Sequence, residues 1–357
     1  MRHHALRPHF LPRALRALLV GCLGLWGAAQ AQQLAAAPPA CAAAFKGQRV
    51  NLVVPHKPGG GFDAYARLLA PALEQALGAR VGVTNMPAAN GLAGWQALLR
   101  PTSPGVHLVG VTSLTPLWER EHILRAPDIT GRDFALLGVF SHGNSVWVTR
   151  RGENPLHKPG PVLIAGSARP ISAMHLSALA LGLQVKPIHS LTASGESILA
   201  LMRGDIDVLV MTEQLFERGA VDAAKLQPWV LLAPPLNAAL QGGPVLAGPG
   251  GRVDQLTAGL SAEERRRRQA AAALAAAFGS TVYAAVMAKS TPEATQGCLR
   301  AVIEGIAFDP GFIAQAERQR LDPRPMRVDD TQALGRQLQQ LAQAHRDVID
   351  EAIARDR

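Results

Sequence analysis

The sequence predicts an α/β fold with two lobes. Short segments rich in β-branched residues alternate with segments whose apolar residues recur at helical spacing, and glycine-containing turns join them. Such alternation with short connections is typical of a parallel sheet covered by helices. It occurs twice, between 49 and 111 and between 162 and 211, and two longer extended segments separate the two runs. The pattern therefore favours two similar α/β lobes with a ligand cleft between them.

In the first run, strands are expected at 49–55, 81–84 and 106–111, and helices at 62–77 and 91–99. The first helix has one apolar face and stops at Gly78, because glycine readily adopts the left-handed conformation that ends many helices. That face is formed by Phe62, Ala66, Leu69, Leu73 and Leu77. Extended segments follow at 134–140 and 145–150, and their length suits a crossing between lobes.

The second run repeats the pattern. Strands are expected at 162–165, 185–188, 206–211 and 229–232, and helices at 171–181 and 195–202. Gly182 and Gly204 each stand where a helix should stop.

The remainder of the chain is expected to be mostly helical. Residues 234–260 are rich in proline and glycine and should be irregular. Ser261 and Glu264 have the spacing of a capping box, which opens a helix to about residue 278. The further expected elements are an extended segment at 281–288, helices that start at Thr291-Pro292 and Asp309-Pro310, and a long terminal helix at 331–355.

Composition and the distribution of charge argue against a nucleic-acid-binding protein. The 357 residues allow one large domain or two medium ones, and 48% of them are hydrophobic, which is enough for a sizeable core. Lysine and arginine outnumber the acids by 36 to 27, but four of the arginines lie in the first 31 residues, which contain no acid. A second basic group, at 265–268, follows two acids on an expected helix and is interpreted as a solvated face, with docking to a membrane partner as the alternative.

Residues 1–31 have the pattern of a secretory signal peptide. A basic start precedes an apolar stretch of about 12 residues, too short to span a bilayer, and Ala29-Gln30-Ala31 is a small-x-small cleavage site. We therefore expect export from the cytoplasm. An alternative is a lipoprotein acylated at Cys22, since the preceding residues resemble a lipoprotein box.

Two cysteines remain after the signal segment, Cys41 and Cys298. In an oxidising exported compartment, an isolated pair predicts a disulfide. The alternative is two buried free thiols.

The sequence from Pro55 to Asp63, PHKPGGGFD, joins an expected strand to an expected helix. Ligands bind at this kind of junction in open α/β sheets, and the free N–H groups of a helix start favour an anion. The spacing matches neither a Walker loop nor a dinucleotide fingerprint. Asp63 either contacts the ligand or pairs with Arg67 one helical turn later.

Three further junctions carry potential donors. They are the turn at 85–94, which contains Asn90 and Gly91, then Thr112 and Ser113 after the third strand, and then Ser167 in the turn that opens the second run. Together, the four junctions predict capture of a small carboxylate by backbone amides and hydroxyls.

At this point the chain resembles a known family. The blocks PHKPGGGFDAYARLL, VGVTNMPAANGLAG, GSARPISAMHLSALALG, SGESILALMRGDIDVLV and STPEATQGCLRAVIEGIAFDPGF are similar to the substrate-binding receptors of tripartite tricarboxylate transporters. The blocks are in the family's order and extend over roughly 46–325. The resemblance implies a two-lobed type II periplasmic binding protein fold, with 46–141 plus 270–333 as lobe 1, 142–269 as lobe 2 and 334–357 as a C-terminal helix.

The resemblance also implies a ligand site. Carried over onto this sequence, the expected ligand-binding residues are Lys57, Gly59, Gly60, Gly61, Asp63, Asn90, Gly91, Thr112, Ser113, Ser167 and Asp207. Asp207 matches the acid of the family's GD-x-D segment, with a surface acid at a strand end as the alternative. The family implies a monomeric receptor that delivers a small organic carboxylate to membrane transporter subunits, with no enzymatic activity, cofactor or metal.

Three departures from the family pattern affect the expected site. The family's Gly-Ala-Gly-Gly turn is here Ala88-Ala89-Asn90-Gly91, and His56-Lys57 replaces residues that are usually uncharged. Lys57 either binds a second carboxylate or is solvated. A Pro-Thr-containing segment of the family is not recognisable in 234–260, so the loop at 237–251 is expected to reshape one wall of the cleft.

Other functions have weaker support from the sequence. The chain lacks G-x-S-x-G, H-E-x-x-H and C-x-x-C, and His142, His175 and His189 lack the spacing of metal ligands. The first rival hypothesis is a receptor of the same fold that reports to a sensor kinase. The second is an exported hydrolase or lyase that uses Asp63 and His142.

Overall fold

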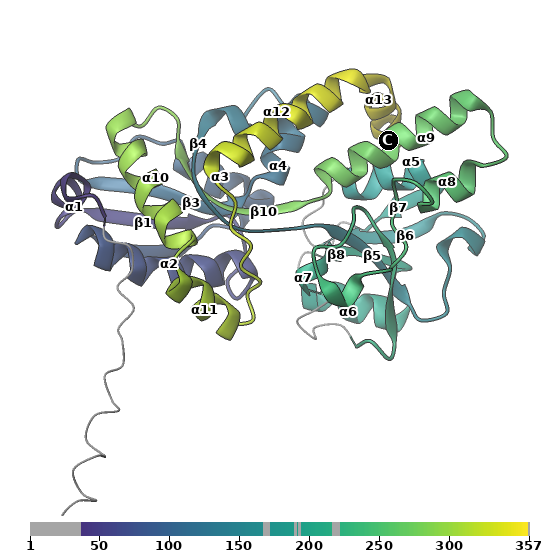
Figure 1. Ribbon diagram of the computed structural model, residues 1–357, viewed down its shortest axis with the longest axis horizontal. Helices are drawn as coiled ribbons and strands as arrows, with labels where there is room; N and C mark the ends of the chain where they lie inside the picture. Colours follow the sequence, from purple (N-terminus) through teal and green to yellow (C-terminus); the bar gives the residue numbers. More distant parts are fainter. Residues whose placement is uncertain (1–36, 167–171, 189–190, 192–193, 216–221, 356–357) are drawn as a thin grey trace, which may run out of the picture. The chain divides into compact units, whose positions relative to one another are not determined.

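The computed structural model describes residues 37–166, 172–188, 191, 194–215 and 222–355. Two five-stranded sheets organise this part of the chain (Figure 1). The first sheet has the order β2-β1-β3-β10-β4, with β1 at Arg49–Val54, β2 at Arg80–Asn85, β3 at Val106–Ser113, β4 at Phe134–Gly143 and β10 at Thr281–Ala288. The second has the order β7-β6-β8-β5-β9, with β5 at Ser145–Arg150, β6 at Val162–Gly166, β7 at Val185–Pro187, β8 at Val208–Thr212 and β9 at Leu226–Leu231.

The expectation of purely parallel sheets is wrong in one respect. β10 runs antiparallel to both of its neighbours in the first sheet, and β5 does the same in the second. Each of these strands follows an element that belongs to the other sheet. The chain leaves the first sheet at the end of β4, and only Asn144 separates β4 from β5. The local alternation of strands and helices does not tell where a strand joins a sheet after the chain has passed through the other one.

Helices cover both faces of the first sheet. Along β1, Val50, Leu52 and Val54 point into one core cluster and Val53 into another, as the two-residue period of a strand requires. The first cluster packs against α1 (Pro39–Phe45), α2 (Gly61–Leu77), α10 (Glu293–Ala307) and α11 (Pro310–Arg318). The second packs against α3 (Leu92–Leu98), α4 (Thr115–Trp118) and the start of α12 (Val328–Ala344).

The second sheet is covered in the same way. One face packs against α5 (Ser177–Leu181), α8 (Arg252–Thr257), α9 (Ala262–Phe278) and α13 (Arg346–Ala354), and the other against α6 (Ser194–Arg203). A short helix, α7 (Glu213–Leu215), follows β8. The remaining short helical turns are Ala88–Gly91, Glu119–Ile123, Gly131–Asp133, Pro155–His157, Ser172–Leu176 and Ala238–Leu240.

Two helix predictions need correction. The expected single terminal helix is broken at His345, whose φ of −126° and ψ of 40° leave the helical region. Val328 at the start of α12 packs in the core of the first sheet, whereas Leu338 and Ala342 later in α12 and Val348 and Ile349 of α13 pack in the core of the second. The segment at 234–260 is not wholly irregular, because α8 forms within it.

The basic group at 265–268 lies on α9, where Arg268 Nε is 2.7 Å from Glu264 Oε1 and Arg267 Nη2 is 3.2 Å from Glu351 Oε1. Ser261 accepts a hydrogen bond from the Glu264 N–H, as the expected cap requires. Two of the four arginines are therefore paired with acids of α9 and α13, and the solvated-face interpretation remains a prediction.

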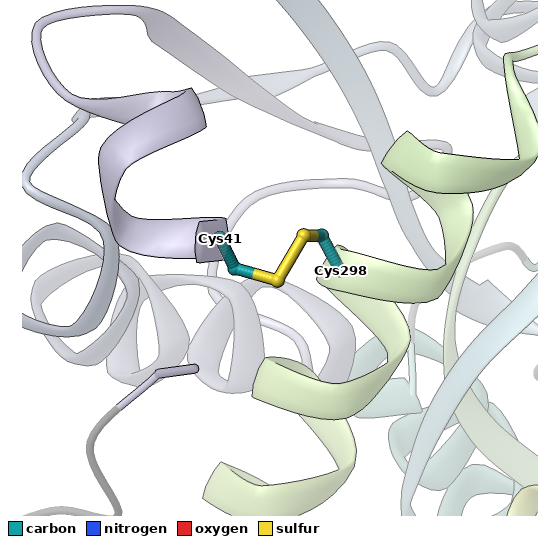
Figure 2. The surroundings of a disulfide bond; sticks show 2 residues. All are labelled: Cys41 and Cys298. Carbon is teal, nitrogen blue, oxygen red and sulfur yellow. A yellow bond between two sulfur atoms is a disulfide. The ribbon is translucent and has the colours of Figure 1, made fainter. Parts of the chain in front are cut away.

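Cys41 of α1 and Cys298 of α10 form a disulfide, as expected from the sequence (Figure 2). Their Cα atoms are 5.4 Å apart although 257 positions separate them in the chain. The bond attaches the first described helix to the first lobe. No helix in the described ranges combines the length and apolar character needed to cross a membrane.

Candidate functional site

The loop between β1 and α2 contains the three glycines, and each has a different reason to be there. Gly59 has a φ of +80°, a conformation that strains any other residue. A side chain at Gly61 would meet the ring of Tyr283 at 3.1 Å, whereas one at Gly60 would find no atom nearer than 3.7 Å. Gly60 is the N-cap of α2 and no side chain caps the helix, so its first N–H groups remain available to an anion.

Asp63 fixes the conformation of this loop through hydrogen bonds. The carboxylate is buried, and its Oδ2 accepts hydrogen bonds from the Gly59 N–H at 2.9 Å and from Arg67 Nε at 3.0 Å. Burial opposes ionisation, but the hydrogen bonds from Arg67, Gly59 and Asn85 outweigh it and lower the pKa of Asp63. An ionised Asp63 thus fixes the left-handed turn at Gly59 and pairs with Arg67 in the predicted order.

His56, which sequence reasoning left out of the site, stands at the entrance of the loop. Its ring stacks on Phe62 at a centroid distance of 4.0 Å, and Phe62 stacks on Tyr283 at 4.2 Å. Burial lowers the pKa of His56 to about 4, so the ring is neutral at physiological pH. This position therefore keeps the uncharged character of the family pattern, while Lys57 is exposed.

The neutral His56 ring faces Thr112. Thr112 Oγ1 accepts a hydrogen bond from Trp95 Nε1 at 3.1 Å and lies 3.5 Å from His56 Nε2. The hydroxyl can donate to this nitrogen or accept from it, because its oxygen carries two lone pairs. When Thr112 donates, Nδ1 carries the ring proton and is the nitrogen that can donate to a ligand.

The turn after β2 has an unusual backbone. Ala89, Asn90 and Gly91 are consecutive residues with positive φ, at 52°, 57° and 91°. Gly91 is buried against the first loop, and a side chain there would lie 2.6 Å from the carbonyl oxygen of Pro55. Asn90 thus adopts a left-handed conformation that the glycine of the family pattern at this position would adopt without strain, and the two loops are in direct contact.

Thr112 and Ser113 require a correction. They are the last two residues of β3 rather than residues of a following turn, and their exposed fractions are 0% and 2%. Strand β3 continues past the expected end because β10 pairs with it as far as Ser113. Thr112 therefore acts by positioning Trp95 and His56.

The last two expected site residues differ in status. Ser167 lies outside the described residues. Asp207 precedes β8, at the amino ends of the parallel strands β6 and β8, whereas Gly166 ends β6 at the opposite edge. Asp207 Oδ2 accepts hydrogen bonds from Lys158 Nζ and, at 2.7 Å, from the Leu163 N–H. This carboxylate therefore lies where the parallel strands of the second sheet begin, opposite the edge at which they end.

The residues of the hydrolase hypothesis have structural partners. His142 Nδ1 bonds the carbonyl oxygen of Arg324 at 2.8 Å, and Asp63 is bound by Gly59 and Arg67. Within the described ranges, no group of three or more His, Cys, Asp or Glu side chains is arranged to hold a metal ion.

Comparison with known proteins gives local sequence matches. No protein-family model matches the chain. It is 35% identical over 81 residues to protein BugT of Bordetella pertussis, which is 23% of this chain and 25% of that protein. It is 31% identical over 91 residues to a UPF0065 protein of Pseudomonas sp. strain P51, which is 26% of this chain and 27% of that protein. Each match thus spans about a quarter of the curated relative's length.

Similarity to solved structures extends over most of the chain. A TctC solute binding protein from Polaromonas is 19% identical with a TM-score of 0.55, over 85% of this chain and 98% of that one. MatC of Rhodopseudomonas palustris with bound malate is 17% identical with a TM-score of 0.58, over 84% and 99%. A second R. palustris protein, with adipate, is 14% identical with a TM-score of 0.61, over 85% and 97%. These matches confirm the two-lobed periplasmic binding protein fold and the resemblance to the receptors of tripartite tricarboxylate transporters.

Proposed function

We propose that this protein is a periplasmic receptor that captures a small organic carboxylate and delivers it to a tripartite tricarboxylate-type transporter, without enzymatic activity. The observation that carries the proposal is the convergence of two loops on one sheet edge. Strands β2, β1 and β3 are parallel neighbours, so the loops after β1 and β2 and the end of β3 share the carboxyl edge where ligands bind in such sheets. The contact between Gly91 and Pro55 joins the two loops.

Within this site, the free N–H groups of Gly60 and Gly61 would hold one carboxylate at the start of α2. The Nδ1–H of His56 would add a neutral donor. Asp63 and Thr112 position these groups and need not contact the ligand. Asn90, Gly91, Ser113 and Ser167 remain proposed contacts on the strength of the resemblance, and Asp207 is left out because of its place in the second sheet.

Lys57 indicates the class of ligand. Lys57 is exposed beside the glycines and is a cation to which a second carboxylate could bind. The malate and adipate bound by two structural neighbours are dicarboxylates. A small dicarboxylate is therefore the ligand class that we test first.

The test is a thermal-shift panel of mono-, di- and tricarboxylates with wild type, Gly60→Val and Gly259→Val. Gly60 has a φ of −83° and ψ of 174°, which valine tolerates, and Gly259 is an exposed glycine with open space around it. A ligand at 100 times its Kd should raise the wild-type Tm by roughly 5 °C. Gly60→Val should abolish this shift with an unchanged apo Tm, and Gly259→Val should retain it.

Two results would contradict the proposal. A full ligand shift in Gly60→Val would remove the glycine loop from the site. Turnover of a bound carboxylate that is lost in His142→Ala would identify an enzyme instead.

Lys57→Gln should weaken the binding of dicarboxylates more than that of monocarboxylates, and equal weakening would reject the proposed role of Lys57. Subcellular fractionation tests the periplasmic location.

A further inference from the structure

A cavity lies on the α12 side of the first sheet. Its volume is about 400 Å³, within the range of small-molecule sites. Leu117, Leu136 and Val286 contribute to an apolar floor, and none of the residues of the loops described above lines it. The cavity is bordered by α4, β4, β10, α10 and α12.

The rim of this cavity is strongly basic. Arg132, Lys289, Arg300 and Arg336 line it, with Glu121 as the one acid in the lining. Arg132 is 3.6 Å from Glu121, but the other three cations form no ion pair within the described part of the chain. The rim thus presents three uncompensated positive charges around one space.

Arg300 provides a specific reason to expect an anion. Its Nε is buried and makes no hydrogen bond within the described ranges. Burial of a guanidinium N–H without an acceptor destabilises the folded protein, because the group loses its hydrogen bond to water and forms no other. An oxyanion in the cavity would supply the missing acceptor, and the planar guanidinium is suited to two oxygen atoms at once.

Trp118 adds a donor and an apolar surface. A side chain at Gly335, in the middle of α12, would lie 3.6 Å from Trp118 Nε1, and one at Gly131 would lie 3.3 Å from Cδ1. Gly131, Gly335 and Trp118 all line the cavity, so the indole borders it beside two residues that have no side chain. Trp118 Nε1 donates no hydrogen bond to the described residues and can reach a ligand in the cavity.

We propose that this cavity is a second binding site, for a small organic oxyanion with an apolar body. Arg300, Arg336 and Lys289 bind the oxyanion, and the apolar body lies against Trp118 and the floor. The proposal does not depend on the carboxylate site in the β1–α2 loop, since the two share no residue.

The experiment is isothermal titration with benzoate, which has a carboxylate and an apolar ring, at low ionic strength. It uses the full chain with Gly60→Val, so that binding at the first loop does not contribute. Arg300→Gln/Arg336→Gln is compared with Arg318→Gln, an exposed arginine of α11 that does not line the cavity. Circular dichroism melts verify that all variants fold.

Saturable binding of benzoate, weakened at least about tenfold by the double substitution and unchanged by Arg318→Gln, is the expected result. Quenching of Trp118 fluorescence by benzoate, absent in Trp118→Phe, would locate the ring. The proposal is overturned if benzoate shows no saturable binding, if the double variant binds it as well as the parent, or if inorganic phosphate, which has no apolar body, binds as tightly.

Discussion

Acidification should destabilise the protein through His56. Burial lowers the pKa of this side chain from 6.5 to about 4, so the native state favours the neutral ring. Between these two pH values His56 binds a proton in the unfolded chain but stays neutral in the folded protein. The stability that His56 contributes is therefore complete above pH 6.5, declines as the pH falls, and is lost by about pH 4.

The magnitude follows from the two pKa values. The difference between 6.5 and about 4 lowers the free energy of unfolding by about 3 kcal/mol once His56 is protonated in both states. At pH 5 the free energy of unfolding is lower by about 2 kcal/mol than at neutral pH. The measurement is urea unfolding of wild type and His56→Phe at pH 7.5 and pH 5.0. Phenylalanine retains a ring on Phe62 but does not titrate.

The comparison isolates one group. Burial also lowers the pKa of His107 and, against an opposing contribution from Glu121, that of His122, but both titrate equally in the two proteins. We expect wild type to lose about 2 kcal/mol more than His56→Phe between pH 7.5 and pH 5.0. An equal loss in both proteins would show that His56 titrates normally, and it would remove the argument for a neutral donor at the loop.

Three further predictions concern the backbone and the disulfide. Gly91→Ala should destabilise the protein by about 2 kcal/mol or more in urea, because its φ is +91° and the new methyl group would lie 2.6 Å from the Pro55 oxygen; a neutral effect would contradict the close approach of the two loops. Ala89→Gly should raise stability by about 0.5 kcal/mol, since glycine relieves a φ of 52° at some entropic cost, and a loss would show that the alanine is unstrained. Reduction of Cys41–Cys298 should lower stability by up to about 5.5 kcal/mol in the chain-entropy treatment of a 257-residue separation; an unchanged urea midpoint with dithiothreitol would show that the bond is not formed.

Local patterns predicted the fold well and the long-range pairing poorly. The helix from Gly61 to Leu77 and its stop at Gly78 follow from apolar spacing and one glycine, both readable over a single window. The antiparallel entry of β10 depends on partners 170 positions away in the chain, such as Tyr283 with Ser113. No short window contains that information.

The same distinction explains the candidate site. Asp63 and Arg67 form an i, i+4 pair, so their contact was predictable. Asp207 was placed by a motif that identifies a strand but does not tell which end of the sheet the acid occupies. His56 was overlooked because its properties come from burial and from the rings of Phe62 and Tyr283, and the signal available was only its position between the strand end and the glycines.

Tyr283 connects the proposed site to the segment where the chain passes between the sheets. Its ring supports Phe62 of the first loop, and its backbone lies in β10, two residues after Thr281, which pairs with Gly143 at the end of β4. A side chain at Gly61 would displace this ring. The stack of Phe62 on Tyr283 therefore connects the first loop to the strand that re-enters the first sheet. Tyr283→Leu should weaken carboxylate binding because Phe62 loses the ring on which it stacks, and unchanged affinity would show that the ring stack has no part in the site.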